Sequence, residues 1–186
     1  DGSSTNTFLG TNNSATPTVG PADNDTPTIS VGSVTVSEAS PYAVVAVTLS
    51  NASTAPITFS PTLNSGTATV GTDTGSTLQY FDGTNWVDVT GPITIPAGST
   101  SVLLRTTITQ DNVFESTAAG LEAFTIATGS VTGGVSNTSG ATGTVTIKDD
   151  GSSTNTFLGT NNSATPTIGP ADNDTPTISV GSVTVS

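Results

Sequence analysis

The stretch TISVGSVTVS at residues 28–37 gives the clearest indication of the fold of this chain. Its isoleucine and valines alternate with serine and threonine, and Gly32 interrupts the alternation halfway along. A period of two is typical of a half-buried strand, because successive side chains of a strand point to opposite faces of the sheet. The stretch therefore predicts an amphipathic β-strand with a bulge or kink at Gly32.

The same alternation recurs through the rest of the first 150 residues, whereas patterns typical of helices are nearly absent. Further strands are predicted at 42–50, 56–63, 78–81, 86–89, 101–108, 124–126 and 141–148. Between two of them, Asp82-Gly83 is a strong hairpin signal, and we expect Trp86 to pack on that hairpin or to close the sandwich. About seven to nine short strands rich in threonine and valine predict an all-β fold, an immunoglobulin-like antiparallel β-sandwich.

The two ends of the chain repeat each other. Residues 150–186 copy residues 1–37 at 36 of 37 positions, and the exception is Val19, which is matched by Ile168. The offset of 149 residues suits one domain plus a linker, which predicts one repeat of a longer tandem array. We expect a linker at 1–26, a sandwich at 27–150, a second linker at 151–175 with a small hairpin around 159–162, and the first strand of the next repeat at 176–186.

The composition excludes several classes of function. The chain carries 14 acidic residues against two basic ones, Arg105 and Lys148, so its net charge is −12. Nucleic acids and anionic membranes are bound through basic patches, and we expect neither as a partner. No stretch approaches the roughly 20 apolar residues of a membrane helix. Cysteine, methionine and histidine are absent, which removes thiolate nucleophiles, zinc sites and histidine-based catalysis, and we expect no enzymatic activity.

The acidic residues are predicted to gather at one pole. If the strand at 28–37 runs upward, counting strand directions brings seven of them to the upper loops, namely Glu38, Asp73, Asp111, Glu115, Glu122, Asp149 and Asp150. Carboxylates this crowded repel one another by several kcal/mol, even at an effective dielectric of about 20, unless a cation lies among them. Oxygen ligands from several loops favour Ca²⁺ over octahedral Mg²⁺, and the alternative is a solvated acidic tip.

Motifs spread over most of residues 27–150 resemble the Calx-β domain family. They are VTVSE at 34–38, GTATVGTD at 66–73, ITIPAGSTSVLLRTTITQD at 93–111, LEAF at 121–124 and TGTVTIKDD at 142–150. Calx-β domains are immunoglobulin-like sandwiches that bind Ca²⁺ at one pole through loop acids and a terminal acidic run. The resemblance implies Ca²⁺ ligands at Glu38, Asp73, Asp111, Glu115, Asp149 and Asp150, and Glu122 is its weakest match.

The sequence departs from the family pattern around the middle glutamate. The paired aspartates that usually precede it are here Gln110-Asp111, which removes one negative charge. Residues 116–122 also lengthen the loop after Glu115. These departures imply fewer or weaker ions, with dissociation constants near the extracellular range of about 10⁻⁴–10⁻³ M.

The long period and the join DNDTPTISV at 23–31 are similar to repeats of giant bacterial surface adhesins of the type-I-secreted, RTX-like class. This resemblance implies a structural extender repeat on the bacterial cell surface or in the biofilm matrix, stiffened by Ca²⁺, whose partners are neighbouring repeats arranged head to tail. A further ion is expected between repeats, at Asp23 and Asp25 of one copy or Asp172 and Asp174 of the other. An Asx-turn pair before Pro27 is the alternative explanation of these aspartates.

Two other functions compete with the extender. The orphan strand at 176–186 exposes an edge that a neighbouring chain can take up, which would produce a filament by strand donation. A carbohydrate-binding module would use Trp86, Tyr80 and Tyr42, but the sequence shows no clustered aromatic platform with charged partners. A glycosidase that uses two carboxylates is disfavoured, because calcium binding explains the acids and the sequence suggests no nucleophile–base pair.

Overall fold

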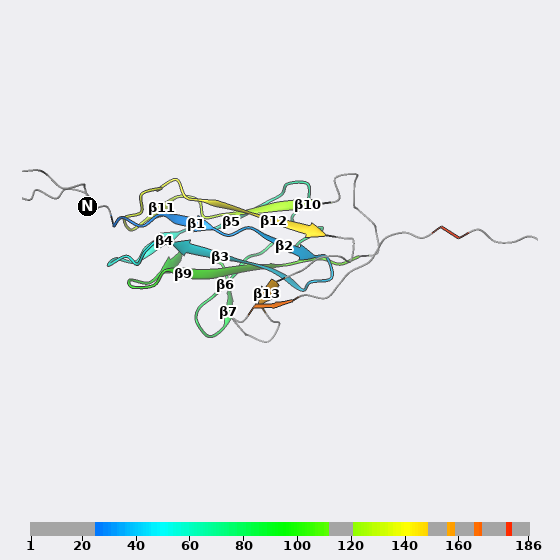
Figure 1. Cartoon of the computed structure of the whole chain (residues 1–186), viewed down its shortest axis with the longest axis horizontal. Coiled ribbons are helices and arrows are strands. Elements are labelled where there is room, and N and C mark those ends of the chain that lie inside the picture. The colour runs from blue at the N-terminus through cyan, green and yellow to red at the C-terminus, as the bar shows by residue number, and fades with distance from the viewer. Residues whose placement is uncertain (1–24, 112–120, 149–155, 159–165, 169–177, 180–186) are drawn as a thin grey trace, which may run out of the picture.

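The computed structural model describes residues 25–111, 121–148, 156–158, 166–168 and 178–179. These parts of the chain form β-strands and no helix. Accordingly, no described segment is a helix long and apolar enough to cross a lipid bilayer. The strands between Ile29 and Lys148 form a two-layered sandwich (Figure 1).

The first layer is a five-stranded antiparallel sheet. Its order is β1 (Ile29–Val31), β3 (Tyr42–Leu49), β9 (Ser101–Thr107), β6 (Gln79–Phe81) and β7 (Trp86–Asp88). The longest pairing joins β3 to β9, from Tyr42 opposite Thr107 to Thr48 opposite Ser101. These two strands form the centre of the layer. The other three strands are short: β1 pairs with β3, β6 pairs with β9, and β7 pairs with β6.

The second layer contains a four-stranded sheet with the order β2 (Val34–Ser37), β12 (Thr142–Lys148), β10 (Glu122–Ala127) and β5 (Thr62–Asn64). A separate three-stranded sheet has the order β11 (Val131–Thr132), β4 (Ile57–Phe59) and β8 (Ile93–Ile95). All pairings of these named strands are antiparallel except that of β2 with β12, which is parallel. The predicted all-β, immunoglobulin-like sandwich is confirmed, with this one parallel pair.

The core lies between the layers and follows the predicted alternation. Val45, Val47 and Leu49 of β3 are buried on one face, as the sequence predicts. Phe124 and Ile126 of β10 are fully buried opposite them. The period of two therefore distinguishes inward from outward side chains on the central strands.

The chain changes sheets within the stretch 28–37. β1 pairs with β3 in one layer and β2 pairs with β12 in the other, so the strand is broken at Gly32 and Ser33. Gly32 N–H donates to Ala46 O at 2.9 Å, and Thr144 N–H donates to Ser33 Oγ at 3.0 Å. The predicted kink at Gly32 is confirmed, and it is the point where the two layers are joined.

The run 56–63, predicted as one strand, is divided in the structure. β4 and β5 fall on either side of Ser60-Pro61 and belong to different sheets. Pro61 has no N–H to donate to a continuing ladder, which favours a break at this point. The described part of 29–148 has twelve strands rather than the seven to nine expected, because the runs 28–37 and 56–63 are each divided and because β8 and β11 were not predicted.

The second linker contains the small hairpin that the sequence predicts. β13 (Thr156–Leu158) pairs antiparallel with β14 (Pro166–Ile168), with Thr156 opposite Ile168. The expected turn around 159–162 lies outside the described residues. The two strands form a sheet of their own, separate from both layers of the sandwich.

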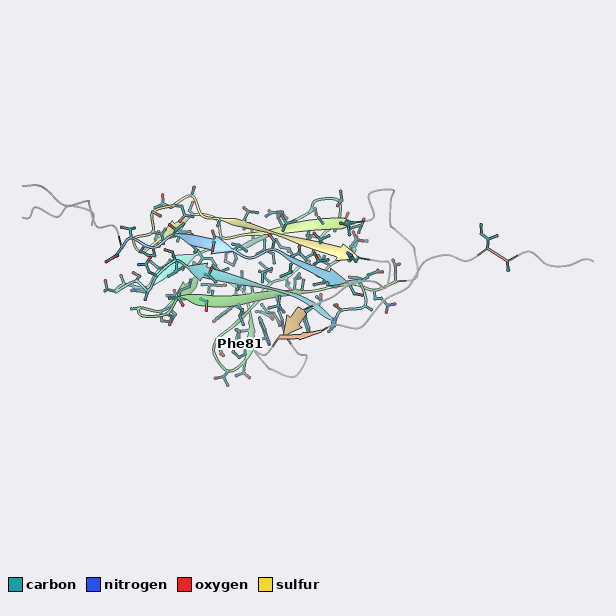
Figure 2. The ribbon with its side chains drawn as sticks, in the orientation of Figure 1. Phe81 is labelled. Carbon is teal, nitrogen blue, oxygen red and sulfur yellow. The ribbon has the colours of Figure 1, made fainter. Side chains whose placement is uncertain are left out.

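The hairpin predicted at Asp82-Gly83 is also present. Phe81 of β6 faces Trp86 of β7 across a four-residue connection, and Figure 2 labels Phe81 on this projecting hairpin. Asp82 Oδ1 accepts the N–H groups of Asn85 at 2.7 Å and Thr84 at 2.8 Å. These bonds, that from Asn85 first, lower the pKa of Asp82 below its ordinary value of 3.8.

Replacement of Gly143 on β12 tests the contact between the layers. An added Cβ would lie 2.3 Å from Gly32 O and 2.7 Å from Val31 Cγ1, so the backbone at the sheet change would have to move. We expect Gly143→Ala to lower the free energy of unfolding by about 1–3 kcal/mol in urea denaturation. Gly91→Ala is the matched control, because a Cβ there meets nothing within 4 Å. Equal stability of the two variants would contradict the close approach.

Acid titration tests the Asp82 turn. Because the pKa of Asp82 is lower in the folded state, its contribution to stability is complete above the unfolded value and is lost as the pH falls through the folded value. We therefore expect Asp82→Ala to melt at a lower temperature than the natural chain at pH 7. This deficit should shrink below pH 3.8. A deficit that stays constant from pH 7 to the lowest pH measured would show that the carboxylate charge plays no part.

Candidate functional site

The acidic pole is organised around Glu38, which directly follows β2. Its backbone N–H donates to Lys148 O at 3.0 Å and so ties the end of β2 to the end of β12. Its side chain is 7% exposed, and Oε1 accepts the backbone N–H of Asp111 at 3.0 Å. The Oε2 atom is shielded from solvent. The carboxylate therefore lies where the end of β12 meets the segment that follows β9.

Asp73 belongs to a tight loop that is bonded to the same segment. Thr69 N–H donates to Asp73 Oδ2 at 2.6 Å, and Asp73 N–H donates to Thr69 O at 3.0 Å. Thr109 N–H donates to Asp73 O at 3.0 Å, two residues before Asp111. The segment 109–111 thus connects the loop of Asp73 to the carboxylate of Glu38.

Glu122 opens β10 at the same end of the sandwich. It lies opposite Ile147, the residue before Lys148 on β12. The structure therefore places the four described acids of the predicted site, Glu38, Asp73, Asp111 and Glu122, around one pole. Glu115, Asp149 and Asp150 lie outside the described residues, although Asp149 follows Lys148 directly in the sequence.

The described acids do not form a compact cage by themselves. Within residues 25–111 and 121–148, no three acidic side chains come close enough together to hold a metal ion. Two of the carboxylates, those of Glu38 and Asp73, accept backbone N–H groups of the pole. The ligand atoms that these side chains offer are carboxylate oxygens, which suit a hard cation such as Ca²⁺. The predicted ligand set remains a prediction.

Of the four aspartates predicted to bind an ion between repeats, the structure describes only Asp25. Asp25 is exposed and precedes β1, at the opposite end of the β1–β2 run from Glu38. Its backbone oxygen accepts a hydrogen bond from Asn51 Nδ2. Asp23, Asp172 and Asp174 lie outside the described residues, so an ion between repeats also remains a prediction.

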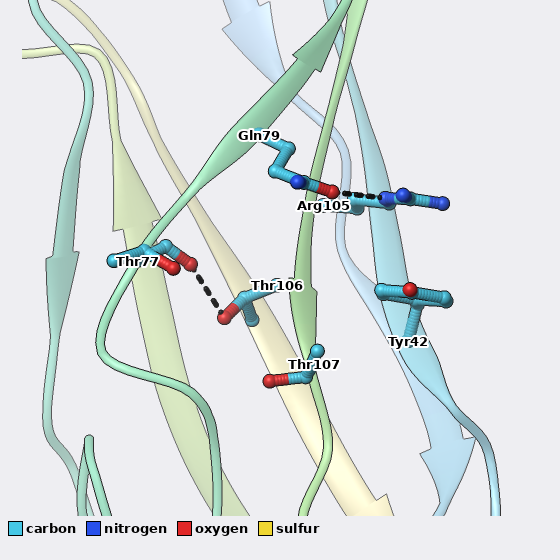
Figure 3. A pocket seen from close by; sticks show the side chains of 6 residues that line it. All are labelled: Tyr42, Thr77, Gln79, Arg105, Thr106 and Thr107. Atoms are coloured by element: carbon cyan, nitrogen blue, oxygen red, sulfur yellow. Dashed lines mark hydrogen bonds between the residues drawn. The ribbon is translucent and has the colours of Figure 1, made fainter. Parts of the chain in front are cut away.

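A second cluster lies on the outer face of the five-stranded sheet. The guanidinium carbon of Arg105 on β9 is 3.8 Å from the ring centroid of Tyr42 and 4.3 Å from that of Trp86. Arg105 Nε also donates to Gln79 Oε1 at 2.8 Å, as Figure 3 shows. A guanidinium between two aromatic faces gains cation–π attraction on both sides. Burial lowers the pKa of Arg105 from its ordinary value, and the nearby Tyr42 opposes this shift.

Apolar side chains surround this cation. Val44 and Trp86 pack together, and Tyr42, Phe81 and Leu103 pack against them. The rings of Phe81 and Trp86 are 5.3 Å apart at an angle of 54°, so Trp86 packs on its own hairpin, as the sequence predicts. We call the set Tyr42, Val44, Phe81, Leu103, Arg105 and Trp86 the arginine face.

A small cavity of about 100 Å³ opens beside the arginine face (Figure 3). It is lined by Tyr42, Thr77, Gln79, Arg105, Thr106 and Thr107. The polar groups in its walls bond to one another, since Thr106 Oγ1 donates to Thr77 O at 2.9 Å and Arg105 donates to Gln79. Its volume suits a few water molecules rather than a sugar ring.

The arginine face corrects one part of the sequence analysis. The sequence showed no aromatic cluster with a charged partner, yet Tyr42 and Trp86, from strands far apart in the chain, enclose Arg105. The available signal was that Arg105 alternates with the core residue Leu104 and so occupies the outward phase of β9. The alternation gave no indication that this outward position is itself buried.

Comparison with known proteins gives a limited likeness. No family model matches the chain, and no curated protein is significantly similar to it in sequence. Among solved structures, CBD12 from CALX1.2 is 22% identical with a TM-score of 0.45, over 66% of this chain and 46% of that chain. The chain thus spans about half the length of CBD12.

Two single domains give the same score. The apo form of the Calx CBD1 domain is 24% identical with a TM-score of 0.45, over 66% of this chain and 99% of that domain. The Calx CBD2 domain is 11% identical with a TM-score of 0.45, over 68% and 90%. These are domains of the kind that the sequence motifs resemble. At these scores, the fold assignment rests on the strand topology described above.

Proposed function

We propose that this chain is a calcium-binding β-sandwich repeat that lengthens and stiffens a large extracellular bacterial surface protein or matrix fibre. The observation that supports calcium binding best is the environment of Glu38. Its carboxylate is withdrawn from solvent at a pole that also receives Asp73, Asp111 and Glu122. Removing a charged group from water is costly unless nearby groups compensate it.

Calcium would supply positive charge that the chain itself largely lacks. Its two basic residues are Lys148, at the end of β12 beside the pole, and Arg105, which is enclosed by aromatic rings on the outer face. Asp149 and Asp150 add two more carboxylates directly after Lys148 in the sequence. Oxygen ligands from several loops are the arrangement that Ca²⁺ accepts and that Mg²⁺ tolerates poorly.

The extender role is supported by the repetition. A segment of 37 residues recurs with one substitution, and a mechanical role benefits from copy number. The polar, acidic composition without cysteine or histidine fits a structural repeat better than a catalytic domain. Under this proposal the partners of each repeat are the repeats before and after it.

Calcium should stabilise the fold by mass action, because the acidic pole exists only in the folded state. At ten to one hundred times the dissociation constant, we expect Ca²⁺ to add about 1.4–2.7 kcal/mol of stability. This corresponds to roughly 3–10 °C in the melting temperature measured by calorimetry. Glu38→Gln and Asp73→Asn should each lose most of this gain.

Asp88→Asn is the matched control for these two variants. It removes the same charge from β7, where Asp88 accepts a hydrogen bond from Gln79 Nε2 at 2.8 Å, away from the pole. We expect this variant to keep the full response to Ca²⁺. A melting temperature that is the same in calcium and in chelator would reject calcium binding for the natural chain.

Strand donation is the second candidate function, and it concerns the second copy of the first strand. Ile29 of the first copy is 1% exposed in the core, whereas its counterpart Ile178 is 96% exposed. The same residue is thus buried in one copy and open to solvent in the other. In a continuous array the second copy would enter the next sandwich, and in a filament it would enter a neighbouring chain.

Small-angle scattering on a protein of two consecutive repeats tests the extender role. We expect an extended rod in millimolar calcium that becomes more compact or more flexible in chelator. Identical profiles in both conditions would contradict stiffening by calcium. A dilution series on the 186-residue chain distinguishes the second candidate, because strand donation predicts particles that grow with concentration, whereas the extender proposal predicts a monomer at every dilution.

A further inference from the structure

The arginine face is buried although it lies on the outside of the sandwich. Val44, Arg105 and Trp86 belong to the outward phase of their strands, yet they are only 7%, 7% and 9% exposed. Leu103 on β9 is also partly buried against them. An outward sheet face that faced water would leave such side chains largely accessible. Other groups therefore lie over these three side chains.

The contacts within the face account for part of this burial. Arg105 covers one side of the Trp86 ring, and Phe81 packs against it at an angle. Val87 and Asp88, the next two residues of β7, are exposed, and Asp88 has the same outward phase as Trp86. The low exposure of Trp86 is thus confined to the cluster around Arg105 and does not extend along β7.

The β13–β14 hairpin lies beside the strand that forms one side of this face. β13 lies against β3, the strand that carries Tyr42 and Val44, and against β2. In Figure 1 the hairpin is seen on the side of the sandwich from which β6 and β7 project. It lies near β3 without a strand pairing to it, and it belongs to neither layer of the sandwich.

The chemistry of the two partners is complementary. Phe157, Leu158 and Ile168 are the main apolar residues of an otherwise polar linker, and all three belong to the hairpin. On the face, Trp86 Nε1 and Arg105 Nη1 are buried donors without a hydrogen-bond partner among the described residues. In a two-stranded sheet, both strands are edges, and the outer backbone carbonyl groups of an edge strand are able to accept hydrogen bonds from such donors.

We propose that the hairpin formed by β13 and β14 docks on the arginine face of the sandwich that precedes it in the chain. The hairpin is then part of the repeat's folded structure rather than part of a free tether. The linker to the next repeat would then begin after Ile168, at the end of the docked hairpin, rather than directly after Lys148, at the end of β12. This docking goes beyond the calcium proposal and does not depend on it.

Trp86 is the only tryptophan in the chain, so its fluorescence reports directly on this face. We expect the full chain with Phe157→Ser and Leu158→Ser to show Trp86 emission at longer wavelength and severalfold stronger quenching by acrylamide. The first copy provides a matched control, because Phe8 and Leu9 occupy the identical motif. Phe8→Ser with Leu9→Ser should leave both signals unchanged.

The outcomes separate the possible occupants of the face. Unchanged emission and quenching in the Phe157/Leu158 variant would overturn the proposal. A response in the Phe8/Leu9 variant instead would assign the face to the preceding linker and would equally overturn it. The same holds if quenching of the natural chain changes on dilution, because the cover would then come from a second chain. Repeating the measurement in chelator keeps this test separate from that of calcium binding.

Hydrogen exchange supplies a reciprocal measurement that a general loss of folding would not mimic. Trp86→Ala should accelerate exchange of the β13 and β14 amides severalfold and leave the β3 and β9 amides protected. Hairpin amides that exchange equally fast in the natural chain and in the variant would show that no docking exists.

Discussion

The structure depends on the passage of one strand between two layers at Gly32 and Ser33. β1 completes the edge of the five-stranded sheet, and β2 completes the edge of the four-stranded sheet. The passage requires Gly143 on β12, because its Cα lies so close to Gly32 that a side chain would meet the backbone oxygen. The parallel pairing of β2 with β12 accompanies this passage and delivers Glu38 to the end of β12 at Lys148. The acidic pole is therefore a consequence of how the layers are joined.

Charge is distributed unevenly over this framework. Acids are set at strand ends, where loops from both layers meet, and the chain has two cations against 14 acids. One cation, Arg105, is used on the outer face, where two aromatic rings replace the acidic partner that a buried guanidinium usually takes. The pole is thus left with Lys148 as its single basic residue nearby. This asymmetry is the physical reason for proposing an external cation at the pole.

The first copy of the duplicated segment shows how a strand depends on its tertiary context. Its Ile29 is a core residue because β1 pairs with β3 and packs within the sandwich. A short amphipathic strand cannot be stable by itself, since its apolar face needs a second layer. The first strand of a repeat therefore depends on the sandwich that the rest of its repeat builds, and the linker hairpin beside β3 is one way in which a repeat can hold its own connection in place.

Four features could be predicted from the amino-acid sequence without any structure: the β class, the kink at Gly32, the hairpin at Asp82 and the position of acids at strand ends. They arise from the period of two and from turn chemistry, which are local properties of the chain. Three others emerge only when the chain is folded, namely the division of residues 56–63 between two sheets, the withdrawal of Glu38 from solvent and the enclosure of Arg105 on an outward face. Each of these depends on which segments, distant in sequence, come to lie against one another. The alternation of side chains distinguishes the two faces of a strand, but it does not specify what covers them.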